Sequence, residues 1–211
     1  MPRCVIDHLT VTAPTLAAGV AHVQEKLGVA MQAGGEHPRM GTHNALLRLG
    51  ERVFLEVIAV DPAALAPGRP RWFDLDGVTA ATPPRLAAWV ARTDDIEATT
   101  AASPLPLGRV QPMSRGALNW QISIPDDGSR PLEGILPILI QWAPGSHPAD
   151  SLADSGCRLL RLEGFHARAD QARKALDAMG FADEYIVSSP PPGAPPHLVA
   201  HVQTLHGLRQ L

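Results

Sequence analysis

Apolar side chains in the N-terminal part of the chain fall into four short blocks separated by turn-forming residues. Three blocks have the two-residue alternation or β-branched content of strands, and one repeats its apolar residues at helical spacing. The blocks are a strand at residues 4–13, a helix at 16–27 and strands at 42–49 and 52–60. Alternation along the first strand places His8 on the face of Ile6 and Asp7 on the opposite face. The predicted order is strand, helix and then two or three strands, with Gly28 as the helix C-cap.

The same order recurs in the middle of the chain. The predicted elements are a strand at residues 85–93, a short helix capped by Asp94 or Asp95, and strands at 116–125 and 135–144. When the two blocks are superposed, Gln141 falls opposite Glu56, and His8 falls opposite Trp89 or an immediate neighbour. A partial third copy, consisting of a strand, a helix and a final strand or hairpin, ends the chain. Because identity between the copies is low, the repeat depends on order and spacing.

The repeat predicts an α+β fold built from paired βαβββ modules. Irregular, proline-containing segments at residues 67–77 and 81–86 mark the seam between the two modules. We therefore expect a first module at residues 1–66, a second at 84–150, and a C-terminal βαβ partial module at 151–211. A chain of 211 residues has the length of one compact structural unit of this kind.

Composition narrows the classes of partner. The net charge is −3, and no basic run or stripe occurs, so nucleic acid and anionic membranes are poor partners. The longest apolar run, residues 135–143, is too short to span a bilayer, and no apolar leader segment begins the chain. Cys4 and Cys157 have neither metal-site nor disulfide-framework spacing, which fits a reducing compartment. We expect a soluble, cytoplasmic protein that acts on or binds a small molecule.

Two polar residues stand where a plain core strand would have apolar ones. Glu56 lies in the middle of FLEVIAV, and a buried carboxylate is costly unless it meets a cation, a metal or a proton. The alternative is that Glu56 pairs with Arg48 or Arg52, or lies at a wet rim. His8 is either a metal ligand or a core imidazole that bonds the backbone.

These residues belong to a longer series of motifs that resembles a known family. The series comprises Asp7-His8-Leu9, Gly41-Thr42-His43-Asn44, residues 55–62 (LEVIAVDP), residues 136–142 (LPILIQW) and His147-Pro148-Ala149. With the repeat, it is similar to the vicinal oxygen chelate superfamily, which includes glyoxalase I and the extradiol dioxygenases. It most resembles the glyoxalase-like bacterial branch, over roughly the first three quarters of the chain.

The resemblance implies a curved eight-stranded mixed sheet with the site in its cup. In metal-dependent members, each module supplies two ligands, one from its first strand and one from its last. The first module matches with His8 and Glu56 as metal ligands, whereas Trp89 or Ala91 and Gln141 stand at the corresponding positions of the second. The implied cofactor is a divalent metal: Fe, Mn, Zn or Ni.

Further residues are candidates for the same cup. His43 and Glu56 are the candidate catalytic residues, and whether His43 ligates a metal or hydrogen-bonds the substrate stays open. The candidate substrate-binding residues are Asn44, Arg115, Trp120 and Gln141. The remaining histidines, including His37 and His147, are interpreted as structural or solvated. No motif for acyl transfer, phosphoryl transfer or dinucleotide binding occurs.

Two functions follow from these expectations. The first is a metal-dependent lyase, isomerase or dioxygenase that acts on a small oxygen-rich substrate, with Glu56 as proton-transfer base if no metal binds. The second is a metal-free protein of the same fold that binds or sequesters a small molecule. Members of the superfamily often associate through their sheets, which leaves a homodimer open.

Overall fold

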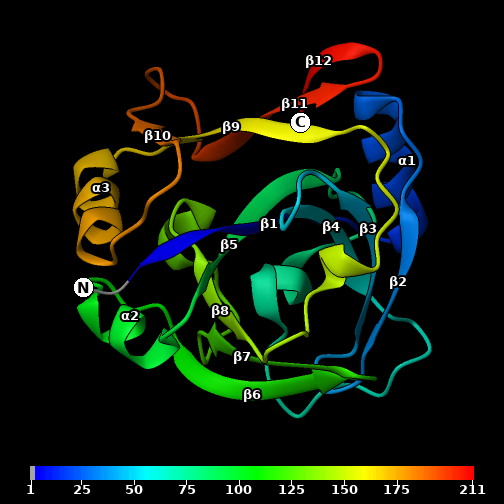
Figure 1. Ribbon diagram of the computed structural model, residues 1–211, viewed down its shortest axis with the longest axis horizontal. Helices are drawn as coiled ribbons and strands as arrows, with labels where there is room; N and C mark the ends of the chain where they lie inside the picture. The colour runs from blue at the N-terminus through cyan, green and yellow to red at the C-terminus, as the bar shows by residue number, and fades with distance from the viewer. Residues whose placement is uncertain (1–2) are drawn as a thin grey trace.

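The computed structural model describes residues 3–211, which form two sheets with α-helices packed around them (Figure 1). The larger sheet has eight strands in the order β2-β3-β4-β1-β5-β8-β7-β6. Its strands are β1 (Cys4–Thr12), β2 (Gln32–His37), β3 (Thr42–Arg48), β4 (Phe54–Val60), β5 (Arg85–Thr93), β6 (Arg109–Arg115), β7 (Leu118–Ile124) and β8 (Ile138–Trp142). The predicted α+β fold of two modules in one curved mixed sheet is confirmed.

The smaller sheet and the helices complete the architecture. The smaller sheet has the order β10-β9-β11-β12, with β9 (Arg158–Phe165), β10 (Tyr185–Ser188), β11 (His197–Thr204) and β12 (Gly207–Gln210). The α-helices are α1 (Leu16–Leu27), α2 (Ile96–Ala102) and α3 (Ala169–Ala178). Short 3₁₀ segments are η1 (Trp72–Gly77), η2 (Pro131–Gly134) and η3 (Pro148–Asp150). Within the described residues, no helix has the length and apolar character needed to cross a membrane.

The two modules meet at the antiparallel pair β1–β5, around which the large sheet is symmetric. In each module the first strand pairs in parallel with the last, β1 with β4 and β5 with β8. His8 lies directly opposite Val90 across the central pair. The outermost strands, β2 and β6, are weak in sequence pattern, because β2 contains Gly34-Gly35 and β6 contains a proline. The sequence prediction therefore left β2 optional and missed β6.

A bulge in β1 changes which side chains reach the cup. Ile6 pairs with Ala91 and His8 with Val90, so Asp7 has no opposite residue on β5. Ile6 and Leu9 consequently both lie in the core cluster on one side of the sheet. The predicted alternation, with His8 on the face of Ile6 and Asp7 on the other, is wrong for this reason.

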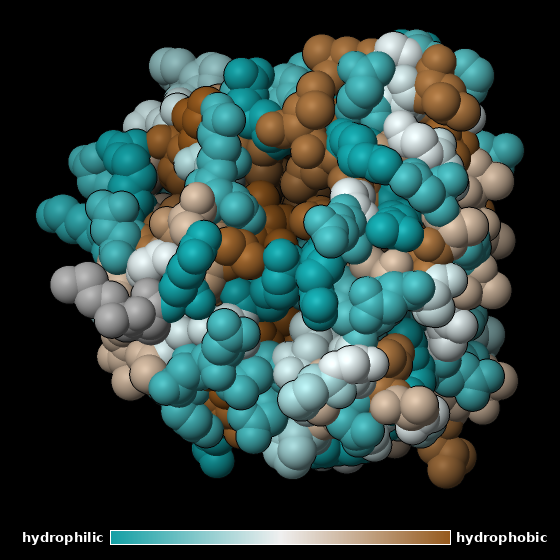
Figure 2. Space-filling view, in the orientation of Figure 1, coloured by the Kyte–Doolittle hydropathy of each residue, from teal (hydrophilic) through white to brown (hydrophobic). Residues whose placement is uncertain are grey.

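The two faces of the large sheet bury different cores. One core contains apolar residues of α1, α3 and the smaller sheet, such as Val23, Leu176 and Leu162, packed against Leu9 and Trp89. Figure 2 shows hydrophobic side chains at the bottom of a hollow on an otherwise mainly hydrophilic face. The other core lies in the concave face of the large sheet, and it is this face that holds the candidate site.

Candidate functional site

A cavity opens in the concave face of the large sheet. Residues from both modules line it: His8, His37, Asn44, Leu46, Phe54, Glu56, Trp72, Phe73, Arg115, Trp120, Ile122, Ile140, Trp142 and Pro148. The cavity is small, with a volume of about 30 Å³. The cavity therefore suits a small molecule or a small part of a larger one.

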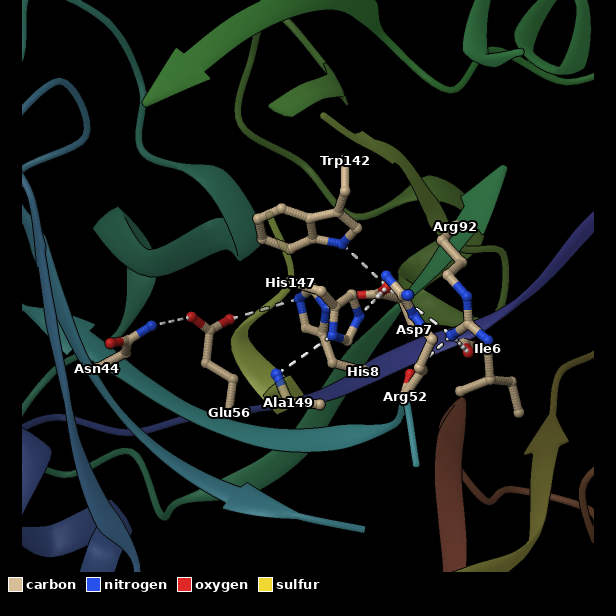
Figure 3. Close-up of polar contacts among 10 residues, drawn as sticks. All are labelled: Ile6, Asp7, His8, Asn44, Arg52, Glu56, Arg92, Trp142, His147 and Ala149. Carbon is tan, nitrogen blue, oxygen red and sulfur yellow. Dashed lines mark hydrogen bonds and ion pairs between the residues drawn. The ribbon is translucent and has the colours of Figure 1, made fainter. Parts of the chain in front are cut away.

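Asp7 and His8 form a buried pair at one end of the cavity (Figure 3). The β1 bulge sets the two side chains beside each other, and His8 Nδ1 lies 2.6 Å from Asp7 Oδ1. Asp7 Oδ2 also accepts hydrogen bonds from Trp142 Nε1 at 3.0 Å and His147 Nε2 at 3.1 Å. Because an ionised Asp7 can only accept, His8 carries its proton on Nδ1 and presents Nε2 to the cavity.

Asp7 stays ionised despite complete burial. Burial alone would raise the pKa of this carboxyl, but the hydrogen bonds from His147 and His8 outweigh it and hold the pKa well below its ordinary value. Arg92 Nη1 lies 3.9 Å from Asp7 Oδ2 and also donates to the backbone oxygens of Ile6 and Arg52, both at 2.7 Å. The arginine thereby fixes the backbone beside the bulge. The result is a permanent negative charge behind His8.

Glu56 faces His8 from the neighbouring strand β4. Its Oε2 lies 3.8 Å from His8 Nε2, and its Oε1 accepts a hydrogen bond from Asn44 Nδ2 at 2.6 Å. Both side chains are buried, and the His8 ring stacks on Phe54 with centroids 4.5 Å apart. An imidazole and a carboxylate, each oriented by a second partner, therefore meet in a largely apolar cavity.

Asn44 is held in one orientation by β2. Its Oδ1 accepts from Gly35 N at 2.8 Å and from Arg115 Nη1 at 3.2 Å. The β2–β3 register shifts at Gly34-Gly35, and a Cβ on Gly34 would lie 2.0 Å from Asn44 Oδ1. Only glycine fits where β2 approaches Asn44 this closely. The glycines weaken the strand propensity of β2, but they allow it to fix the orientation of the Asn44 amide in the site.

Arg115 supplies a positive charge from the opposite edge of the sheet. Besides Asn44, its Nη1 contacts His37 Nε2 at 3.0 Å, so the last residue of β6 is bonded to β2 and β3. Since the arginine donates, His37 Nε2 accepts, and His37 Nδ1 contacts Thr42 Oγ1 at 3.2 Å. Burial and the neighbouring Arg115 lower the pKa of His37 to about 3, and His37 is therefore neutral at physiological pH.

The structure brings together most of the predicted site residues. The cavity contains His8, Asn44, Glu56, Arg115 and Trp120. It does not contain His43 or Gln141. His43 lines a separate groove beside α1, with Leu16 and Val60 among its neighbours.

Gln141 is turned away from the cup. Its Oε1 accepts a hydrogen bond from Ile96 N, at the start of α2, at 2.8 Å. The superposition that set Gln141 opposite Glu56 is off by one residue. His8 corresponds to Val90, and Phe54 and Ile138 are their parallel partners, so Glu56 corresponds to Ile140. The predicted counterparts Trp89 and Ala91 both face the helix-side core.

Sequence reasoning missed several residues of the site. His37 and His147 were interpreted as structural or solvated, but one bonds Arg115 and the other bonds Asp7. His147 belonged to a recognised motif, so a signal for it existed. Asp7 also belonged to a recognised motif, Asp7-His8-Leu9, but strict alternation pointed its side chain away from His8. No pattern indicated Trp72, which reaches the cavity from the irregular seam.

A divalent metal centre with four protein ligands does not fit these residues. His8 Nε2 and Glu56 Oε2 are close enough for one ion at about 2.1 Å from each. Among residues 3–211, however, no group of three or more His, Cys, Asp or Glu side chains is arranged to hold a metal ion. The corresponding positions of the second module, Val90 and Ile140, carry no donor atoms.

Two βαβββ modules that share one curved sheet, with a His–Glu pair in the cup, define a glyoxalase-type protein of the vicinal oxygen chelate superfamily. The sequence agrees: residues 6–180 match the family model described as "Glyoxalase-like domain". The chain belongs to this family. No curated protein matches the sequence significantly.

Solved structures share the fold at low identity. A hypothetical protein from Staphylococcus aureus superposes with a TM-score of 0.60 and 13% identity, over 89% of this chain and 86% of that one. A variant of 4-hydroxymandelate synthase from Streptomyces coelicolor gives 0.50 and 16%, over 100% of this chain and 63% of that one. A methylmalonyl-CoA epimerase complex gives 0.43 and 19%, over 68% and 97%. The first two structures share the fold alone with this chain, and the third is too distant to add to that conclusion.

Proposed function

We propose that this glyoxalase-like protein is an isomerase or lyase that moves a proton between neighbouring atoms of a small oxygen-rich substrate. The observation that carries the proposal is the His8–Glu56 pair, 3.8 Å apart in a buried cavity, with Asp7 and Asn44 bound to their far sides. Groups that exchange protons are effective when they are positioned and desolvated in this way.

The two side chains have complementary roles in this scheme. Glu56 takes a proton from a carbon next to a carbonyl group, and the bond electrons move onto the carbonyl oxygen. His8 acts in its cationic form, with a proton on Nε2 as well as on Nδ1, and donates the Nε2 proton to that oxygen, which yields an enediol or enol. Asp7 stabilises the imidazolium, because its negative charge lies 2.6 Å from Nδ1. Glu56 then returns its proton to the same or the adjacent carbon, and the hydroxyl on the other carbon gives its proton back to His8 Nε2 as the carbonyl bond forms there.

The pair favours transfer between adjacent atoms, because both groups lie side by side rather than on opposite sides of the cavity. Arg115 is the cation bonded within the cup, and it would balance negative charge that develops on the substrate. The sequence also placed His43 and Gln141 among the catalytic and binding residues. Their positions outside the cavity do not support those roles.

A divalent metal at this site (Fe, Mn, Zn or Ni) would have two protein ligands, His8 Nε2 and Glu56 Oε2. Water or substrate oxygens would have to complete its coordination shell. No step above depends on it. Elemental analysis of the purified protein, and of a Glu56→Gln variant, tests whether metal is bound at this pair.

The experiment that tests the function is carbon–hydrogen exchange in D₂O, followed by proton NMR over a panel of small hydroxy and oxo compounds. We expect exchange with at least one compound, slowed about 10²- to 10⁴-fold by Glu56→Gln. Exchange that Glu56→Gln leaves unchanged contradicts the proposal.

A second candidate function is metal-free binding or sequestration of a small molecule. The apolar residues Val90 and Ile140, at the second module's counterparts of His8 and Glu56, favour it. Under this alternative the same panel gives a bound ligand without exchange. The two functions therefore separate in one experiment.

A further inference from the structure

Trp72 has a buried indole N–H that lacks a partner. The residue is 3% exposed and lines the cavity, and its Nε1 makes no hydrogen bond within residues 3–211. A buried tryptophan N–H usually finds an acceptor, because leaving it unpaired forfeits its hydration without replacement. Trp142, which also lines the cavity, follows this rule, since its Nε1 donates to Asp7. Trp72 thus combines a ring that lines the site with a donor that has no acceptor in the described protein.

Arg115 has unused donors beside it. Only its Nη1 is bonded in the described part of the chain, to His37 and Asn44, which leaves Nε and Nη2 free for a ligand. Two adjacent guanidinium nitrogens match the two oxygens of a carboxylate. The ring of His37 lies edge-on to Trp72, with centroids 5.1 Å apart, and accepts from Arg115. Trp72 and Arg115 therefore flank the same neutral imidazole.

The position of this charge relative to Glu56 limits the ligand. The side chain of Asn44 bridges Arg115 and Glu56: its Oδ1 accepts from Arg115, and its Nδ2 donates to Glu56. Arg115, Asn44, Glu56 and His8 therefore form one series of contacts, which ends at His8 Nε2, 3.8 Å from Glu56 Oε2. This series is the reason why the proposed ligand has an oxygen on the carbon next to its carboxylate.

We propose that Arg115 and Trp72 form a carboxylate subsite, and that the ligand is a short 2-oxo or 2-hydroxy carboxylic acid. The assignment of this ligand as a substrate rests on the proposed function, whereas its binding does not. The small cavity, about 30 Å³, suits an acid with a short chain. The aromatic walls, which include Phe54 and Trp120, contact its apolar end.

The test is a titration of tryptophan fluorescence at fixed ionic strength with pyruvate and lactate, and with the neutral amides pyruvamide and lactamide. Three tryptophans line the cavity, so the signal reports on this site. We expect the acids to bind at least about tenfold more tightly than the matched amides. Equal binding of acid and amide, or binding of neither acid, overturns the proposal.

Variants assign the preference to the two residues. Arg115→Gln should remove the preference for the acid over the amide, and Arg115→Lys should restore part of it. Trp72→Phe should weaken binding of the acids about tenfold while the fold is kept. Arg109→Gln is the matched control, because Arg109 lies on the same strand and its side chain is 77% exposed. Loss of the preference in Arg109→Gln, or its retention in Arg115→Gln, contradicts the subsite.

The carboxylate subsite and the proposed reaction can be disproved independently of each other. Glu56→Gln should still bind pyruvate and lactate, since it alters neither Arg115 nor Trp72. Acid binding without hydrogen exchange would uphold the subsite and reject the reaction. Exchange with other compounds, without preference for the acids, would do the reverse.

Discussion

The two halves of the large sheet have the same strand order but opposite chemistry at matched positions. In the first half, β1 and β4 bring His8 and Glu56 into the cup, whereas Val90 and Ile140 occupy the corresponding places on β5 and β8. The second half contributes aromatic and aliphatic walls and Arg115, which reaches across to β2 and β3. A shared backbone plan thus leaves the chemistry of each half free to differ.

Replacement of Asp7 should produce the largest difference between the halves. Asp7→Ala leaves the hydrogen-bond donors of His8, His147 and Trp142 buried without their acceptor, which should cost about 3–5 kcal/mol of unfolding free energy. The matched change in the second half is Ser123→Ala, because Ser123 is also fully buried but accepts one bond, from Leu139 N. We expect about 1 kcal/mol there. Urea denaturation measures both, and equal costs would contradict the role given to Asp7.

Making the second half resemble the first tests whether its apolar positions exclude a metal. The double variant Val90→His, Ile140→Glu adds two donors of the kinds that zinc binds. At a Zn²⁺ concentration 100 times the dissociation constant, we expect stabilisation of about 2.7 kcal/mol, read from thermal unfolding. The conservative pair Val90→Ile, Ile140→Val is the control and should show no added response over the natural protein. An unchanged zinc response in the double variant would show that the missing donors are not the obstacle.

The glycine pair of β2 gives a smaller but specific effect. Gly34→Ala places a Cβ 2.0 Å from Asn44 Oδ1 and 2.7 Å from its backbone oxygen, so the strand must shift. Overpacking of this kind costs about 1–3 kcal/mol. At Gly68 an added Cβ meets nothing within 4 Å, so Gly68→Ala should change stability by less than about 0.5 kcal/mol. Similar values for the two variants would argue against the tight approach at Asn44.

At pH 7, His37 should give the smallest effect, because its contribution appears only as a pH dependence of the unfolding free energy. Its folded pKa of about 3 lies below the ordinary value, so the unfolded chain binds the proton first as the pH falls. The stability is present above about pH 6.5 and is lost as the pH falls toward 3. His37→Gln should reduce this slope by up to about 1.4 kcal/mol per pH unit. Urea titrations at pH 7, 6, 5 and 4 measure it, and parallel curves would contradict the neutral state of His37.

The architecture could be predicted from sequence because it repeats. Strand and helix patterns occur twice in the same order, and the central strands are apolar enough to be recognised without a structure. The sequence left β2 optional and did not indicate β6, because glycine and proline obscure the alternation of these two strands. Each of them nevertheless supplies a contact to Asn44, through Gly35 and Arg115.

The site was harder to predict because it depends on register. One residue of error placed Gln141 opposite Glu56, although Ile140 is the true counterpart. His43 and Asn44 are adjacent on β3, and the pleat sends only Asn44 into the cup. Periodicity identifies a strand, but the face of each side chain follows from pairing that sequence alone does not show.

The bulge at Asp7 changes which residues of β1 face the core. Core-facing residues of this strand are even-numbered before the bulge, as in Cys4 and Ile6, and odd-numbered after it, as in Leu9 and Val11. Only at the switch do two consecutive side chains share a side, and there they are an acid and an imidazole. Deletion of Asp7 would restore regular alternation along β1, and the strand would still bury its core residues. The contact between Asp7 and His8 would be lost. An irregularity of one residue thus lets a central strand, rather than a loop, place an acid and an imidazole side by side in the candidate site.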